Sequence, residues 1–166
     1  MRERAAASAT LAATLTILAA ILPACGSPSG PAGRTPSCQG PSGANRVEVV
    51  VEHGDGHLAE RCVGFKGHAI AALDAMRVSR LKFASETASF GVALCSIDGE
   101  PAQYATCFPA GAPYWAMFVA RQGGAWTAPS VGVQGVSLGP GDALGWRYDP
   151  QSQNPAPPPA PPAVFG

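Results

Sequence analysis

The clearest structural signal in the chain is Arg46-Val47-Glu48-Val49-Val50-Val51-Glu52, a run in which valine alternates with glutamate at both ends. Alternation with a period of two is typical of a β-strand that has one face buried and the other in water. The next residues, His53-Gly54-Asp55-Gly56-His57, combine glycine with short polar side chains and predict a turn. Leu58 to Phe65 then predicts a second short strand, so the folded part begins with two strands joined by a turn.

Downstream of these strands, the sequence predicts one helix and several further strands. Gly67 to Val78 is the best helix candidate, because Ile70, Leu73 and Met76 recur at helical spacing on one face. Apolar runs bounded by glycine and proline predict strands at residues 90–97, 102–107, 114–119 and 144–148. Strands on both sides of a single helix indicate an α+β fold in which the helix packs across a mostly antiparallel sheet.

The amino terminus has the layout of an export signal. Two arginines among the first four residues precede an apolar stretch from Ala5 to about Ala24. This segment ends in Leu22-Pro23-Ala24-Cys25, which resembles the lipobox of bacterial lipoproteins. We therefore expect residues 1–24 to be a signal peptide and Cys25 to be lipidated, which would hold the protein at the outer face of the cytoplasmic membrane. The alternative is ordinary cleavage nearby, which leaves Cys25 as a thiol.

The cysteine count is consistent with the same compartment. The chain has five cysteines, and assigning Cys25 to lipid leaves an even number, which favours disulfides outside the cytosol. We expect Cys95 to pair with Cys107, because these residues bracket the turn signal Ile97-Asp98-Gly99-Glu100-Pro101, and Cys38 to pair with Cys62. A zinc site is the alternative for four cysteines, but the sequence contains no Cys-x-x-Cys pair.

Composition and charge limit the function classes. The 11 basic and 11 acidic residues cancel, so no net field draws the protein to nucleic acid or another acidic polymer. With 20 glycines and 17 prolines, the chain is expected to be rich in loops and to have flexible flanks. We expect residues 25–45 to form a flexible spacer and residues 150–166 an extended, disordered tail, either solvated or bound by a proline-reading partner.

Motifs for catalysis and for phosphate-containing cofactors are absent from the sequence. It contains neither a Gly-x-Ser-x-Gly elbow nor a phosphate-binding glycine loop, so we predict no catalytic residues, no enzyme activity and no cofactor. His53, Asp55 and His57 have metal-ligating chemistry. They lie on a glycine turn, where polar residues are expected in any case, and no fourth ligand is apparent, so we predict no metal site.

Five aromatic residues gather towards the end of the folded part, in a chain that is only 7% aromatic: Tyr114, Trp115, Trp126, Trp146 and Tyr148. Flat amphipathic rings on strands serve both the cores of small domains and the clefts that bind small molecules. Strand alternation places Tyr114 and Trp115 on opposite faces, so the five rings cannot all belong to one core. They are the candidate ligand-binding residues; the alternative is that most of them pack inside.

Several short motifs follow one another in a recognisable order. After the valine strand, Arg-Cys-Val and the helix come residues 90–101, Phe-Gly-Val-Ala-Leu-Cys-Ser-Ile-Asp-Gly-Glu-Pro, then residues 114–118, Tyr-Trp-Ala-Met-Phe, and residues 141–148, Gly-Asp-Ala-Leu-Gly-Trp-Arg-Tyr. This order, over residues 46–149, resembles the transcobalamin-like C-terminal domain family. The resemblance implies a β-grasp-type fold and an extracytoplasmic module that binds a soluble ligand through the aromatic strand ends.

These features lead to one functional hypothesis and one rival. The hypothesis is a lipid-anchored, non-enzymatic module that binds a small, vitamin-like ligand, with cobalamin as one class, or a component of a membrane uptake system. The rival is a cell-envelope protein-interaction domain without a pocket, in which the aromatic rings are core.

Overall fold

The computed structural model describes residues 37–41, 45–89, 91–150 and 154–159. The expected signal peptide, Cys25 and most of the expected spacer lie outside these residues. Helix α1 (Ala72–Val78) has seven residues, and in the described ranges no helix is long and apolar enough to cross a membrane.

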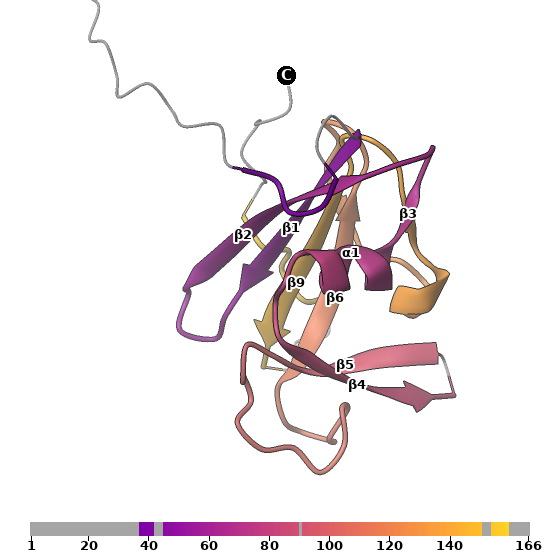
Figure 1. Ribbon diagram of the computed structural model, residues 1–166. Coiled ribbons are helices and arrows are strands. Elements are labelled where there is room, and N and C mark those ends of the chain that lie inside the picture. The colour runs from indigo at the N-terminus through magenta and orange to yellow at the C-terminus, as the bar shows by residue number, and fades with distance from the viewer. Residues whose placement is uncertain (1–36, 42–44, 90, 151–153, 160–166) are drawn as a thin grey trace, which may run out of the picture. The chain divides into compact units, whose positions relative to one another are not determined.

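The central sheet joins strands from the two ends of the described sequence (Figure 1). Its strands are β1 (Asn45–Glu52), β2 (Leu58–Phe65), β6 (Tyr114–Ala120), β7 (Trp126–Thr127) and β9 (Ala143–Asp149). Their spatial order is β2-β1-β9-β6-β7. The first strand, β1, lies parallel to the last, β9, and every other neighbouring pair in this sheet is antiparallel. The predicted α+β class with a mostly antiparallel sheet is confirmed.

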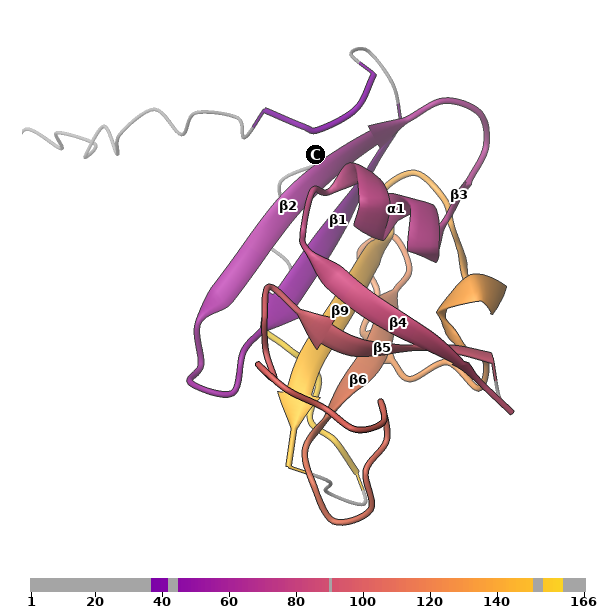
Figure 2. The same cartoon turned by 60° about the horizontal axis from the view of Figure 1, so that its bottom comes forward.

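One face of this sheet forms the core. Val47, Val49 and Val51 are completely buried on it, as their alternation predicts. Helix α1 packs across the same face and contributes Ala72, Ala75 and Met76 to the core, and Figure 2 shows it lying over the strands. The valines thus lie between the sheet and the helix and have no contact with water. This burial of apolar surface is the main source of stability in a domain of this size.

Two small ribbons complete the cover of the core face. Strand β3 (Ile70–Ala71) pairs with β8 (Ser137–Leu138), and β4 (Phe83–Ala88) pairs with β5 (Gly91–Ile97). Between them lies the short 3-10 turn η1 (Val133–Gly135). Leu94, Ile97, Val133 and Leu138 all reach the core from these elements.

The structure corrects the start of the predicted helix and removes one predicted strand. The helix begins at Ala72 and not at Gly67, because the backbone of Ile70 and Ala71 pairs with β8 before the helix starts. Residues 102–107 are not a strand, because the partner of β5 is the preceding segment, β4, which is close enough in sequence to form a tight antiparallel ribbon. Residues 102–107 instead form a loop, whose last residue, Cys107, donates its backbone N–H to Glu86 Oε1 at 2.9 Å.

Both predicted disulfides are confirmed. Cys38 pairs with Cys62 on β2, and Gln39 beside it exchanges backbone hydrogen bonds with that strand. Cys95 on β5 pairs with Cys107 and fixes the loop that precedes β6. All four sulfurs are oxidised, so the zinc alternative is wrong for these cysteines. Two structural disulfides indicate folding in an oxidising compartment outside the cytosol.

One buried carboxylate, that of Asp142, holds the turn that precedes β9. Asp142 is 6% exposed, and its oxygens accept hydrogen bonds from the backbone N–H of Gly139 and Gln122 at 2.8 and 3.0 Å. Arg121 adds an ion pair at 2.6 Å. A carboxylate held by three donors connects the turn before β9 to the end of β6, and thereby sets the register of the two strands.

Residues 154–159 belong to the expected proline-rich tail, and among them Pro158 is less than 2% exposed. Its ring lies beside Gly145 on the face of the sheet opposite α1, so at this residue the tail is packed and not solvated. A glycine in β9, Gly145, provides the physical reason, because the absence of a side chain there leaves a hollow that the proline ring fills.

Glu48 is an acidic side chain buried on the same outer face. It is 5% exposed, and burial raises its pKa from 4.5 to about 7, with a further contribution from the negative charge of Glu60. The folded state therefore binds the Glu48 proton more tightly than the unfolded state does. Stability from this group is present below about pH 4.5 and is lost as the pH rises through about 7.

We expect Glu48→Gln to raise the free energy of unfolding at pH 8 by about 1–3 kcal/mol, because the variant has no buried charge to form. At pH 4 the variant and the wild type should be equally stable. Urea denaturation at both pH values measures the difference, with Glu60→Gln as a control for the smaller charge–charge contribution. A variant that is no more stable than the wild type at pH 8 would contradict the assignment.

Candidate functional site

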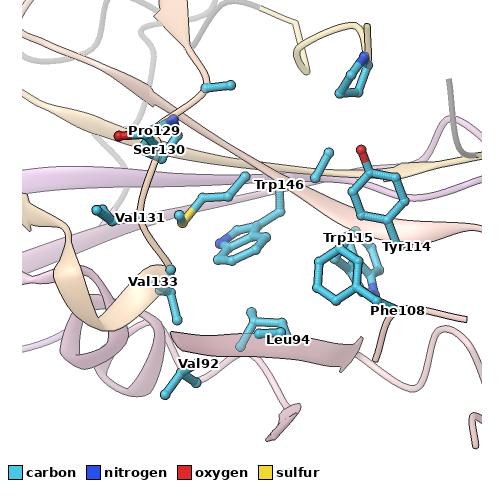
Figure 3. A pocket seen from close by; sticks show the side chains of 16 residues that line it. Val92, Leu94, Phe108, Tyr114, Trp115, Pro129, Ser130, Val131, Val133 and Trp146 are labelled. Carbon is cyan, nitrogen blue, oxygen red and sulfur yellow. The ribbon is translucent and has the colours of Figure 1, made fainter. Parts of the chain in front are cut away.

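An apolar pocket of about 340 Å³ opens between β5, the edge of β6 and the segment 128–133 (Figure 3). Strand β6 is covered by the short β7 only at Val119 and Ala120, so the rest of its edge borders this space. The volume is within the range of pockets that hold small molecules. Its lining comprises residues 92–94 of β5, 114–117 of β6, 128–133, and Phe108, Trp146 and Pro155.

The indole of Trp146 lies in the middle of the pocket wall. Trp146 pairs with Met117 across β9 and β6, and both side chains point to the core face. The indole N–H is buried and has no hydrogen-bond partner among the described residues. Figure 3 shows this nitrogen on the side of the ring nearest Val133. An unpaired buried donor destabilises a fold by about 1–3 kcal/mol and is uncommon in native proteins.

Trp115 lies beside it, but its indole is fully engaged. Its N–H donates to the carbonyl oxygen of Glu100 at 2.8 Å. The ring also packs edge-on against His53, with centroids 5.5 Å apart, and against Tyr148 at 5.1 Å. Trp115 is therefore held in place by its contacts, whereas the buried N–H of Trp146 has no acceptor among the described residues.

The rim of the pocket carries exposed apolar side chains. Phe108 is 42% exposed and Val131 is 48% exposed, and both border the pocket. Phe108 packs against Tyr114, with ring centroids 5.2 Å apart. Burial, together with the negative charge of Asp149, raises the pKa of Tyr114 above its usual value, so its hydroxyl remains protonated at neutral pH.

The structure brings three of the five predicted aromatic residues together. Tyr114, Trp115 and Trp146 line the pocket, and Tyr148 packs behind Trp115 without reaching it. Trp126 lies on the opposite face of the sheet and contacts the tail. Trp115 and Trp146 are only 3% and 2% exposed, so they belong to the core and to the pocket wall at once.

The aliphatic part of the pocket wall could not be predicted from the sequence. Val92, Leu94, Met117, Val131 and Val133 come from three separate segments that only the folded chain brings together. The apolar run of residues 91–97 marks a buried strand, but nothing local shows that its side chains border a cavity.

The turn between β1 and β2, residues 53–57, borders a second hollow, which is polar. This hollow lies close to Trp115, because His53 contacts the Trp115 ring. His53 Nδ1 lies 2.7 Å from Glu100 Oε2, and the backbone N–H of Gly54 donates to the same carboxylate. Asp55 accepts the backbone N–H of His57 at 2.9 Å, as expected of a turn residue. These contacts tie the β1–β2 turn to Glu100 and so hold the carbonyl that Trp115 binds.

This turn does not gather metal ligands. The rings of His53 and His57 are 5.8 Å apart, and in the described ranges the one set of three donor atoms within 4.8 Å is Glu86, Cys95 and Cys107. Two members of that set are joined in a disulfide. A thiolate site is therefore excluded there.

The sequence matches no protein-family model and no curated protein. Among solved structures, the chain is similar to a protein from Ruminococcus gnavus ATCC 29149 described as a "putative metal binding protein". The sequence identity is 16%, the TM-score is 0.47, and the match covers 62% of this chain and 94% of the other.

The two indoles provide a matched pair of substitutions. We expect Trp115→Phe to lower the free energy of unfolding by about 1–2 kcal/mol more than Trp146→Phe does, because only the first removes a hydrogen bond. Both substitutions remove the same ring volume from the core. Thermal or urea unfolding of the two variants measures the difference, and equal losses would show that the N–H of Trp146 has a partner in solution.

Proposed function

We propose that this protein is an extracytoplasmic, lipid-anchored module that binds a small soluble ligand in the pocket of Trp115 and Trp146. The observation that carries the proposal is the unpaired indole N–H of Trp146 in the wall of an apolar pocket. The N–H is shielded in the free protein, so a ligand with a hydrogen-bond acceptor would satisfy this donor after the adjoining side chains move aside, while its apolar part fills the space. The unpaired donor lowers the stability of the free protein, and a ligand that accepts its hydrogen bond would remove this penalty.

The lining indicates what kind of ligand fits. In the described part of the pocket wall, the side chains with polar atoms are Tyr114, Trp115, Ser130 and Trp146, and the others are aliphatic, aromatic, thioether or proline. The volume of about 340 Å³ suits a single ring system or a short acyl group, and a whole corrinoid could insert only one part. No charged side chain lines the described wall, so binding rather than acid–base catalysis is the activity we propose.

We also propose that the fold is of the β-grasp type and that the chain is related to the transcobalamin-like C-terminal domain family. Two features support this: α1 packs across one face of a mixed sheet, and the first and last strands of that sheet are parallel neighbours at its centre. The motif of residues 141–148 coincides with the turn held by Asp142 and with strand β9. A vitamin, or a component of a vitamin uptake system, is the ligand class that this relationship suggests.

We expect Val131→Trp to weaken ligand binding about tenfold or more, because a larger side chain at the rim would block the pocket mouth. Leu58→Trp is the matched control, since Leu58 is 38% exposed on β2, at the opposite edge of the sheet. Isothermal titration calorimetry with cyanocobalamin, dimethylbenzimidazole, biotin and thiamine tests both variants. If the wild type bound none of the four compounds, or if Val131→Trp bound them equally well, the pocket would not be the binding site.

The anchor has its own test. We expect Cys25→Ala to release the protein from the membrane fraction, because the acyl chains would have no attachment point. Fractionation followed by mass spectrometry of the amino terminus measures the outcome. A variant that remains as firmly membrane-bound as the wild type would show that lipid on Cys25 is not the anchor.

A further inference from the structure

The face of the sheet opposite α1 holds part of the chain's own tail in a defined contact. The indole N–H of Trp126 donates to the carbonyl oxygen of Pro159 at 3.2 Å. Arg147 Nη1 donates to the carbonyl oxygen of Pro157 at 3.3 Å. Between these two hydrogen bonds, the ring of Pro158 is less than 2% exposed.

The hollow that receives Pro158 exists because of a glycine. A Cβ atom on Gly145 would lie 2.8 Å from Pro158 Cγ and 2.9 Å from the ring of Trp126, and both distances are too short. In the sheet, Gly145 lies between Val50 and Phe118, which are only 1% and 4% exposed although they face away from the main core. The bare backbone of β9 is therefore the floor of the hollow, and Trp126 is a wall.

The donors of this site match the chemistry of a proline peptide. Proline has no backbone N–H, so a polyproline segment offers carbonyl acceptors and apolar rings. The site supplies two N–H donors, from Trp126 and Arg147, that bond the first and third carbonyls of the three-residue segment 157–159. Aromatic-lined grooves with this combination are a general means of binding polyproline helices.

The donors are held by the sheet and not by the tail. Arg147 is positioned by Glu52, its direct neighbour on β1, through an ion pair of 3.5 Å. Trp126 belongs to β7, which pairs with β6. The arrangement is thus built into the sheet and does not need the tail to organise it.

We propose that Trp126, Gly145 and Arg147 form a binding site for extended proline-rich peptides, with residues 157–159 as its resident ligand in cis. A proline-rich segment of another protein binds to this site when the tail leaves it. Because the tail is tethered, its effective concentration is on the order of millimolar, and a peptide in trans competes poorly while the tail is intact. This site lies on the face of the sheet opposite the main core, and its argument does not rest on the proposed function, although Pro155 of the same tail also borders the ligand pocket.

The test empties the site in the full-length chain. The triple variant Pro157→Gly, Pro158→Gly and Pro159→Gly keeps the tail length but removes its rings. A fluorescent peptide with the sequence of residues 154–159 is titrated into this variant and into the wild type, and anisotropy is measured. We expect the triple variant to bind the peptide at least about tenfold more tightly than the wild type. Equal binding, or no binding, would overturn the proposal.

One variant inside the site and one outside it test where the peptide binds. In the triple variant, we expect Trp126→Phe to weaken peptide binding about tenfold, since it removes one of two hydrogen bonds and part of the wall. Tyr104→Ala removes an aromatic ring that is 44% exposed in the loop before Cys107, and it should leave the affinity unchanged. Loss of binding in both variants, or in neither, would overturn the assignment.

A second variant covers the case in which the triple variant does not fold. Gly145→Ala leaves the tail sequence intact but fills the hollow. We expect the indole N–H resonance of Trp126 to shift in the nuclear magnetic resonance spectrum, and proteolysis within the tail to become faster. An unchanged Trp126 resonance would overturn the proposal, and so would a concentration-dependent dimer of the wild type, because the site would then serve exchange of tails between copies.

Discussion

The parallel pairing of β1 with β9 is the constraint on which the other features depend. It places the start and the end of the folded sequence side by side at the centre of the sheet. Three contacts follow from this one pairing: Trp146 reaches the core beside the valines of β1, Gly145 lies next to Val50, and Arg147 meets Glu52. The Asp142 carboxylate defines where β9 begins, and so determines which side chain lies on which face.

The two faces of β9 have different environments although their residues alternate along one strand. On the core face, Trp146 contributes to an apolar wall with an unpaired donor. On the outer face, Gly145 and Arg147 receive a segment rich in acceptors. Pro155, four residues before the tail contact ends, also borders the pocket. The tail therefore links the two regions, and a change in its position alters one part of the pocket lining.

Local sequence patterns predicted those features whose cause is local. The valine alternation gave β1, the apolar runs gave β6 and β9 to within a residue or two, and the turn between Cys95 and Cys107 indicated their pairing. The helix start was wrong because the pairing of Ile70 with a strand 68 positions later is not visible locally. The hollow at Gly145 could not be predicted for the same reason. The role of a glycine in a strand depends on which residues pack against it in the folded sheet, and the sequence alone does not show them.

The position of β9 in the sequence also has a consequence for folding. Because β1 and β2 are neighbours in sequence, they can form their hairpin early in folding, and in an oxidising compartment the bond between Cys38 and Cys62 then secures it. The other edge of β1 has no partner until β9, which begins at Ala143, is also present, so the valines of β1 stay partly exposed until then. Contacts between residues so far apart in sequence slow folding and prolong the aggregation-prone stage. The unfolded domain therefore exposes its apolar valines for longer than its small size alone would suggest.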